Sequence, residues 1–327
     1  MRAIVITRAG PPDVLQLRDV PEPEPAAYEL RVWVHATAIN RADLLQRLGR
    51  YATPPGSPAD IPGLEYAGTV ESTGSAVTRW QPGDRVMGLV GGGSYAEYLV
   101  THEAEALRIP EAMTFEDAAA VPEAFITAHD ALFTQMRLRS GETLLIHAVG
   151  SGVGTAALQL ARVAGARVFG TQRSRWKLDK ATSLGLDVAI DVTLDDFASV
   201  VLRETQGRGV HGVLDLVGGD YLAGDLDALA VKGRILLVGL VAGATTQLDM
   251  RALLTKRATL IGTVLRARSL DEKIEVAQAF GRDVLPLLDA GSVVPVIDDV
   301  LPLEDAARAH ELVGENRNFG KIVLSVD

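Results

Sequence analysis

The sequence predicts an α/β protein of two domains, in which a doubly wound parallel sheet is inserted into a partly open β-barrel. Three observations carry this prediction: short alternating strands fill residues 1–122, strands and helices alternate over residues 143–263, and a strand pattern returns at residues 321–326. A chain of 327 residues also exceeds one ordinary core, so two domains are expected. We assign residues 1–122 and 266–327 to the catalytic or substrate domain and residues 123–265 to a dinucleotide-binding domain.

The first third of the chain has the alternation of half-buried strands. Residues 29–39 (ELRVWVHATAI) alternate apolar and polar side chains, and shorter patterns follow at residues 65–71, 85–90 and 95–100. Turns rich in Gly and Pro, such as residues 81–84 (QPGD), separate them. Short strands at this spacing are typical of a partly open barrel or a sandwich.

The hydrophobic period changes from strand to helix at Thr114. A Thr followed three residues later by an acid, here Asp117, is typical of a helix N-cap, and it precedes the Ala-rich residues 115–121. Pro122 is expected to end this helix, and a second helical pattern covers residues 123–134.

The middle of the chain alternates strands with helices. Strand patterns lie at residues 143–148, 167–171, 188–190, 212–216, 234–240 and 259–263. Helical patterns lie between them at residues 155–164, 176–184, 195–205, 221–231 and 250–256. Six strands with crossover helices are what a doubly wound, Rossmann-type sheet requires. Helices at residues 270–290 and 303–313 follow, and the strand at residues 321–326 is expected to return to the first domain.

A glycine-rich turn follows the first strand of the inserted domain. The turn reads Gly150-Ser151-Gly152-Val153-Gly154 and leads directly into an Ala-rich helix. Glycines allow a tight turn and close backbone approach to a pyrophosphate, and the helix N-terminus supplies N–H groups and positive potential. Ordinary close packing of strand and helix is the alternative. The position at the head of a six-strand pattern favours a dinucleotide site.

The end of the second strand distinguishes the two nicotinamide cofactors. An NAD site places an acid about 20 residues beyond the glycines to hold the ribose hydroxyl. Here the first acid is Asp179, and Arg173, Ser174 and Lys177 precede it. Arg and Lys suit a 2′-phosphate, so the pattern favours NADPH over NADH, although a solvated helix start is the alternative.

Composition excludes several classes of function. The chain has no cysteine, so disulfides, thiolate nucleophiles and cysteine zinc sites are excluded, and its six histidines lack ligand spacing. We therefore expect no metal site. A net charge of −10 argues against nucleic acid as a partner. We expect no signal peptide and no membrane span, and therefore a cytoplasmic protein.

Several motifs resemble the medium-chain dehydrogenase/reductase superfamily over essentially the whole chain. They are residues 63–68 (GLEYAG), 81–86 (QPGDRV) and 151–154 (SGVG). Residues 40–51 and 54–56 (PPG) resemble its zinc-independent quinone oxidoreductases, and residues 109–111 and 122–128 suggest the p53-inducible type. Zinc alcohol dehydrogenases have a Gly-His-Glu stretch and a cysteine ligand. Leu64 takes the His place here, which argues against alcohol dehydrogenation.

The resemblance implies a GroES-like catalytic domain and a set of site residues. The residues implied at the nicotinamide end are Asn40, Tyr51, Thr127, Gly239, Leu240, Leu265 and Asn316. Lys177 and Ser174 would take the 2′-phosphate, and Gly152 and Val153 would lie at the pyrophosphate. The family often has Asn-Tyr after the third strand, where this chain has Asp191-Val192. This departure argues against a strict NADPH preference, unless Arg173 or Arg175 binds the adenosine phosphate in place of the missing Tyr.

The expected chemistry is hydride transfer from NADPH to a quinone. Tyr51 is the first candidate to act as acid or to stabilise the developing oxyanion, against the alternative of a packed surface aromatic; Asn40 is the second candidate. An enal or enone reductase would use the same site, and a non-catalytic NADPH-binding sensor is the alternative from another class. Asp43 and Arg47 are expected to form an i, i+4 ion pair. Glu65 is expected to be structural.

The resemblance also implies a homodimer. Residues 259–263 (TLIGT) are an apolar candidate for an edge strand that would aggregate if left bare.

Overall fold

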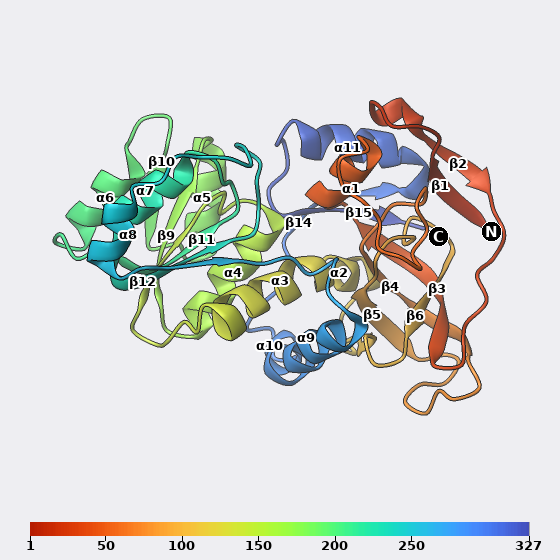
Figure 1. The fold of residues 1–327 in the computed structure, drawn as a ribbon. Helices are drawn as coiled ribbons and strands as arrows, with labels where there is room; N and C mark the ends of the chain where they lie inside the picture. Colours follow the sequence, from red (N-terminus) through yellow and green to blue (C-terminus); the bar gives the residue numbers. More distant parts are fainter. Residues whose placement is uncertain (327) are drawn as a thin grey trace. The chain divides into compact units, whose positions relative to one another are not determined.

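The structure is a computed structural model that describes residues 1–326. It divides into two compact units (Figure 1): unit 1 comprises Met1–Ile126 and the chain from Leu265 onward, and unit 2 comprises Thr127–Val264. As predicted, one helix ends before Pro122 and a second helical segment follows, with π-helical turns at Pro122–Ile126 and Asp130–Gln135 on either side of α3 (Thr127–His129). Proline is tolerated there because the first turn of a helix needs no N–H donor.

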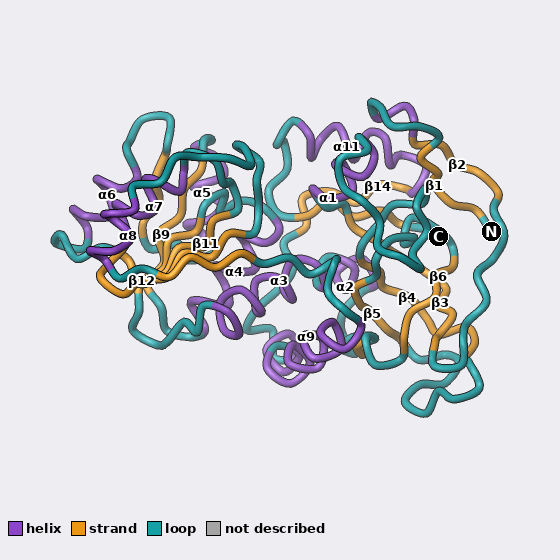
Figure 2. Tube along the Cα trace, viewed as in Figure 1, coloured by secondary structure: helices purple, strands orange, loops and turns teal. Residues whose placement is uncertain are grey.

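Unit 1 is built around a mixed seven-stranded sheet, shown as orange strands in Figure 2. The strand order is β14 (Ile297–Pro302), β15 (Lys321–Ser325), β3 (Glu29–Ala38), β4 (Glu65–Thr73), β5 (Arg85–Leu89) and β7 (Leu107–Arg108), with β6 (Tyr98–His102) paired to β3. Only the β14–β15 pair is parallel. A separate hairpin-like pair joins β1 (Arg2–Ile6) and β2 (Leu15–Asp19).

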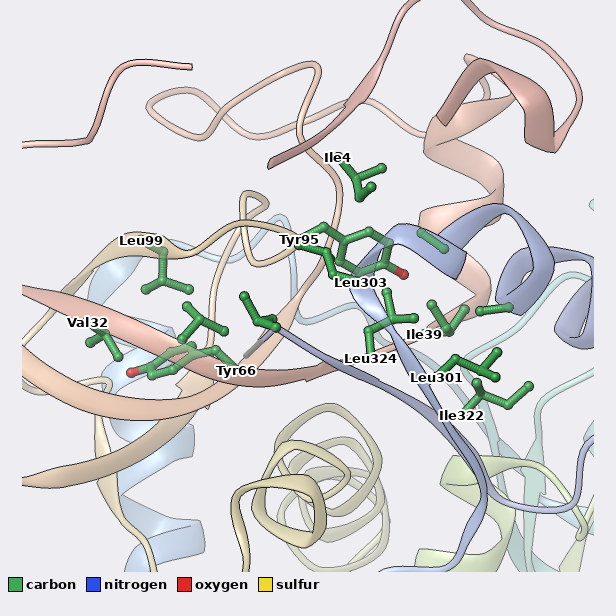
Figure 3. Close-up of a cluster of buried hydrophobic side chains, with 14 of the residues drawn as sticks. Ile4, Val32, Ile39, Tyr66, Tyr95, Leu99, Leu301, Leu303, Ile322 and Leu324 are labelled. Carbon is green, nitrogen blue, oxygen red and sulfur yellow. The ribbon is translucent and has the colours of Figure 1, made fainter. Parts of the chain in front are cut away.

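The returning C-terminal strand completes the core of unit 1. Ile322 and Leu324 of β15 are buried in the same cluster as Val32 and Tyr66 of β3 and β4 (Figure 3). Successive side chains of a strand point to opposite faces, which explains why burial alternates along β3 from Glu29 to Ala36; its last residues, Thr37 and Ala38, are both buried. The structure thus confirms that the parallel sheet is inserted between two parts of a GroES-like unit.

The helices of unit 1 follow the predicted patterns with one exception. The helices are α1 (Arg41–Arg47), α2 (Phe115–Ala119), α9 (Leu270–Asp283), α10 (Leu285–Asp289) and α11 (Ala306–Gly314). Thr114 caps α2 by accepting a 3.1 Å hydrogen bond from the N–H of Asp117, as predicted. The single helix predicted for residues 270–290 is wrong, because Pro286 cannot continue the hydrogen-bond ladder of α9 and instead lies in the first turn of α10.

Unit 2 is a doubly wound parallel sheet. The strand order is β10 (Val188–Asp191), β9 (Arg167–Gln172), β8 (Thr143–Ile146), β11 (Val210–Asp215), β12 (Leu229–Leu237) and β13 (Thr259–Gly262), and all pairs are parallel. Counted along the chain this is the order 3-2-1-4-5-6 of dinucleotide-binding sheets. The direction of winding reverses between β8 and β11, and a ligand crevice is expected at that point.

Helices cover both faces of this sheet. The helices are α4 (Gly152–Val163), α5 (Arg175–Ser183), α6 (Phe197–Glu204), α7 (Tyr221–Ala228) and α8 (Met250–Lys256). Leu145 of β8 packs in a cluster with Ala198 of α6 and Leu226 of α7, whereas its neighbours in β8 face the other side. The helix predicted at residues 221–231 ends at Ala228, because the next residues extend β12 backwards in the sheet.

Among residues 1–326, no helix combines the length and the apolar composition that crossing a bilayer requires.

Candidate functional site

The glycine turn in unit 2 joins β8 to α4 and leaves the first N–H groups of α4 at its open end. The Ser151 hydroxyl caps α4 by accepting a 3.1 Å hydrogen bond from the N–H of Gly154. A Cβ atom on Gly154 would lie 2.5 Å from the carbonyl oxygen of Ala148, so no larger residue fits there without backbone movement. The tightly packed backbone of the turn allows close approach of a ligand, and the N-terminus of a 12-residue helix faces the turn. Both features fit a pyrophosphate.

The end of β9 brings a group of basic and polar side chains beside that turn, since β9 pairs with β8. Ser174 is the N-cap residue of α5, but its side chain makes no capping hydrogen bond. Arg173 is exposed. Lys177 is only 5% exposed, and its Nζ lies 5.4 Å from the centroid of the Trp176 ring. These three polar side chains fit a phosphate group on the ribose.

Arg175 and Asp191, which lie near these side chains, both have partners of their own. Arg175, a candidate to compensate for Asp191-Val192, pairs with Asp179 on α5 at 2.9 Å. Asp191 accepts hydrogen bonds from the N–H and hydroxyl of Thr193, which lower its pKa. The acid at the end of β10 is therefore engaged locally.

The end of β12 lies at the same edge of the sheet. Gly239 packs so closely that a Cβ atom would lie 2.3 Å from the carbonyl oxygen of Leu216. Leu240 is 53% exposed there. Because parallel strands end at one edge, residues 150–153, Arg173, Ser174, Lys177, Gly239 and Leu240 belong to one side of unit 2. Thr127 is buried at the start of α3.

His147, immediately after β8, is a core histidine. Its Nδ1 lies 2.8 Å from the Thr171 hydroxyl and its Nε2 lies 2.6 Å from Oδ1 of Asp225. The ring is fully buried against Phe197 and Tyr221. Its hydrogen bonds serve the interior of unit 2.

In unit 1, Asn40 belongs to a buried polar cluster. Asn40 is the N-cap residue of α1; its Nδ2 donates to Oε1 of Glu65 at 2.8 Å, and its Oδ1 accepts from Nζ of Lys321 at 2.6 Å. Nζ of Lys321 also donates to Oε1 of Glu65 at 2.6 Å. The N–H of Glu123 donates to the other carboxylate oxygen of Glu65 at 2.7 Å. Glu65 therefore organises this cluster, a structural role of the kind expected.

The predicted ion pair of Asp43 with Arg47 is wrong. Asp43 turns back to accept a 2.8 Å hydrogen bond from the N–H of Asn40, forming a capping box, and it accepts another from the Tyr95 hydroxyl at 3.1 Å. Burial raises the pKa of Asp43 to about 6. On the far side of Tyr95, His310 Nε2 lies 3.2 Å from the same hydroxyl, and burial lowers the pKa of His310 to about 3. Capping and burial together direct Asp43 toward Asn40 and Tyr95 and away from Arg47, which is also buried.

Tyr51 is half-buried against a buried arginine. The guanidinium carbon of Arg266 lies 5.1 Å from the centroid of the Tyr51 ring. Burial raises the pKa of Tyr51, the carboxylate of Glu123 raises it further, and the charge of Arg266 opposes both. The phenol is therefore protonated at neutral pH and can donate a hydrogen bond.

An open pocket of about 480 Å³ lies beside Arg266, wholly within unit 1. Its polar lining is Arg266, Glu123, Glu105 and Lys273, and apolar side chains including Leu265 form the rest. Burial, with the charge of Glu65 second, raises the pKa of Glu123 to about 8. Burial also raises the pKa of Glu105 to about 7.

The fourth predicted residue of unit 1, Asn316, has a left-handed backbone with φ of 55°. Its Oδ1 accepts a 2.7 Å hydrogen bond from Nη2 of Arg41, the residue after Asn40. In unit 1, Asn316 therefore lies near the start of α1. Tyr51 packs against Arg266, and Leu265 lines the pocket beside Arg266. Sequence reasoning missed Glu123, Arg266 and Lys321. Glu123 lies within the motif at residues 122–128, and Arg266 and Lys321 carry no signal beyond a charge beside an apolar stretch.

Comparison with known families gives two matches along the chain. The model of an alcohol dehydrogenase GroES-like domain matches residues 26–111, and that of a zinc-binding dehydrogenase matches residues 152–285. The residues described here do not fit zinc. Within residues 1–326 no group of three or more His, Asp or Glu side chains is placed to hold a metal ion, and the Lys321 ammonium group already binds the oxygen atoms of Glu65 and Asn40.

Curated relatives match along almost their whole length. The quinone oxidoreductase of Pseudomonas aeruginosa is 35% identical, over 96% of this chain and 96% of the relative. The quinone oxidoreductase of Rattus norvegicus is 31% identical, over 99% of this chain and 97% of the relative.

Solved structures with the same fold include two with informative descriptions. A mycobacterial protein solved in complex with NADPH is 30% identical, with a TM-score of 0.90 and 100% of each chain covered. The CurK enoyl reductase is 27% identical, with a TM-score of 0.87, covering 100% of this chain and 99% of that structure.

Proposed function

Since the chain belongs to the medium-chain dehydrogenase/reductase family, of the quinone oxidoreductase type, we propose that it transfers a hydride from NADPH to a quinone without a metal ion. Binding of a pyridine nucleotide follows from the family. The choice of NADPH and of a quinone is the proposal.

The single observation that carries the proposal is the end of β9. Arg173, Ser174 and Lys177 stand there, and the first acid after them, Asp179, is paired with Arg175. A 2′-phosphate would receive the charge of Lys177 and the fork of Arg173, with the Ser174 hydroxyl as an additional donor. The pyrophosphate would lie at Gly150, Ser151, Gly152 and Val153, where the N-terminus of α4 supplies N–H groups. Thr127, Gly239, Leu240, Leu265 and Asn316 remain our candidates for the nicotinamide end.

The proposed reaction requires the protein to place the cofactor and the quinone next to each other and to supply one hydrogen-bond donor. Bound NADPH would supply the hydride, and a quinone that takes up this hydride and one proton becomes a hydroquinone. Tyr51 is our candidate to donate a hydrogen bond to the quinone oxygen as negative charge develops on it. Its raised pKa keeps that donor protonated at neutral pH. Asn40 is our second candidate, as a residue that orients the cofactor or substrate.

An enal or enone reductase is the second candidate function, favoured by the similarity to the CurK enoyl reductase. The hydride would then go to the β-carbon of the conjugated carbonyl and the proton to the α-carbon, with Tyr51 again at the oxygen. A common test is therefore needed for both acceptors.

The test is the rate of NADPH oxidation with a benzoquinone, an ortho-naphthoquinone and a 2-enal, with NADH in parallel and with no acceptor as the blank. Turnover that requires a quinone and favours NADPH supports the proposal. Turnover confined to the enal would mean that the substrate is an enal and not a quinone, with NADPH still the cofactor. Cofactor binding without turnover on any acceptor would identify a sensor in place of an enzyme.

We also propose that the protein is a homodimer that pairs through β13. This strand is the edge of the unit 2 sheet, and its Leu260 is 43% exposed. An exposed apolar edge strand is a ready template for pairing with a second copy. Light scattering of the native chain is expected to give twice the mass of one chain, and Leu260→Lys is expected to reduce it to one. A native mass of one chain would contradict this assembly.

A further inference from the structure

Arg266 is buried without a carboxylate partner. Its side chain is 7% exposed, and within residues 1–326 no carboxylate oxygen lies within ion-pair distance of it. Nε donates to the carbonyl oxygen of Gly91 at 2.8 Å, and Nη2 donates to Oε1 of Gln46 at 2.7 Å. Nη1 is buried and has no acceptor. Burying a charge in this way is costly, so a role for the charge is expected.

The contacts of Arg266 converge on Tyr51. Gln46 lies on α1, Gly91 follows β5, and Tyr51 lies in the loop after α1, so one guanidinium group joins three segments of unit 1. A planar guanidinium group that is fixed by two hydrogen bonds and lies 5.1 Å from a ring centroid fixes the position of that ring. A Lys in its place would keep the charge but lose the fork.

We propose that Arg266 is a positioning residue for Tyr51: its guanidinium group holds the ring, and its charge favours negative charge on the phenol oxygen. The inference rests on the proposed function only where it concerns turnover, because the effect on Tyr51 exists without substrate. A donor that must carry part of the charge developing on a quinone oxygen is improved by a nearby fixed cation.

Two further charged groups, Glu123 and Asp43, act on this pair. Glu123 opposes Arg266 in its effect on Tyr51, and Arg266 itself faces Asp43 in addition to Tyr51 and Glu123. Glu123 in turn faces Glu65, Lys321, Asp43 and Arg266. Loss of the Arg266 charge is therefore expected to raise the pKa of both Tyr51 and Glu123. Loss of the Glu123 charge is expected to lower the pKa of Tyr51.

The experiment titrates Tyr51 directly in the full chain. The ultraviolet absorbance of tyrosinate is followed with pH, and the titration of the Tyr51→Phe protein is subtracted. With Arg266→Met the Tyr51 titration is expected at higher pH than in the wild type, and with Arg266→Lys it returns toward the wild type. Glu123→Gln should move it to lower pH, which keeps the test available if the Met variant does not fold.

Arg47→Met is the matched control, because Arg47 is also 7% exposed, also has guanidinium nitrogen atoms without acceptors, and does not act on Tyr51. It is expected to leave the Tyr51 titration unchanged. An unchanged titration in both Arg266→Met and Glu123→Gln would overturn the proposal, and so would a shift of equal size in Arg47→Met.

A kinetic arm separates this inference from the proposed function. Arg266→Met is expected to lower kcat with a quinone on the order of 10-fold while the KM for NADPH changes little, and Arg266→Lys should recover part of the loss. If Tyr51→Phe leaves turnover unchanged while Arg266→Met still shifts the titration, the role of Tyr51 in turnover fails and the Arg266–Tyr51 relationship stands.

Discussion

Nζ of Lys321 lies 2.6 Å from Oε1 of Glu65, and the two residues are 256 positions apart in the chain. Both side chains are buried, at 5% and 0% exposure. The contact ties the last strand, β15, to β4, on the two sides of the inserted unit in the sequence. It also fixes Asn40, which bonds to both partners.

Removing one partner of this pair is expected to destabilise unit 1 strongly. Lys321→Met leaves a buried carboxylate without its cation, at a cost of about 3–5 kcal/mol. Urea denaturation followed by fluorescence in a Trp176→Phe background reports on unit 1, where Trp33 and Trp80 lie. Arg2→Met, which breaks an exposed pair with Glu97, is the control and should leave the midpoint almost unchanged. Equal midpoints in the two variants would contradict the importance of the buried pair.

His310 is expected to make unit 1 sensitive to acid. Its pKa is lowered from an ordinary 6.5 to about 3, so the unfolded chain binds a proton between these pH values that the folded chain does not. The stability that it contributes is complete above pH 6.5 and is lost as the pH falls toward 3. Asp43, with its pKa raised to about 6, acts in the opposite direction over a narrower range.

The His310 contribution is isolated by comparing unfolding free energies of the wild type and His310→Gln from pH 7 downward. Glutamine can still donate to Tyr95 but does not titrate. The difference between the two proteins should shrink or reverse as the pH falls, since only the wild type loses stability through this group. A difference that stays constant with pH would show that His310 does not carry the effect.

Lys177 is expected to discriminate between the two cofactors. Lys177→Glu should raise the Kd for NADPH roughly 10- to 100-fold, because a charge-assisted contact becomes a repulsion, with a much smaller change for NADH. Lys180→Glu is the matched control: it lies on the same helix, with Nζ 5.1 Å from the centroid of the same Trp176 ring, and it is exposed. Fluorescence titration with NADPH and with NADH measures the Kd of each variant. Equal losses of NADPH affinity in the two variants would indicate a nonspecific effect of charge and would contradict a phosphate site at Lys177.

Gly154 is expected to be required for the geometry of the turn. Its Cβ in Gly154→Ala would lie 2.5 Å from the carbonyl oxygen of Ala148, so the start of α4 must move, at a cost of about 1–3 kcal/mol and with weaker nucleotide binding. Gly314→Ala on α11 is the control, since the nearest atom to its Cβ would be Cδ2 of Leu44 at 3.7 Å, an ordinary contact. Calorimetric binding of NADPH and thermal unfolding are compared for both. Wild-type affinity for NADPH in Gly154→Ala would show that the turn is not part of the nucleotide site.

The fold was largely predictable because its signals are local. The six strands of unit 2 follow from hydrophobic periodicity, and the Thr114 cap follows from an acid at a fixed offset. The errors have one local and one non-local cause. Pro286 divides a helix, and the extension of β12 to Leu229 is decided by pairing within the sheet, which no single segment encodes.

The candidate site was predictable only in part. Residues near Gly154 and Lys177 are marked by spacing along the chain, whereas Arg266 and Lys321 gain their partners from positions far away in sequence. Asp43 shows the same limit: its spacing to Arg47 suits an ion pair, but the burial of Tyr95 and the capping of α1 decide its contacts. Tertiary burial determines these roles.

The most direct test of the central claim is the rate of NADPH oxidation with a quinone by the wild type and by Tyr51→Phe. We predict turnover that depends on the quinone and exceeds that with NADH. We predict a fall in kcat of about 100-fold in the variant, because the hydroxyl that stabilises the developing oxyanion is lost. Quinone turnover that is equal in the two proteins, or no turnover with any quinone, would contradict the account.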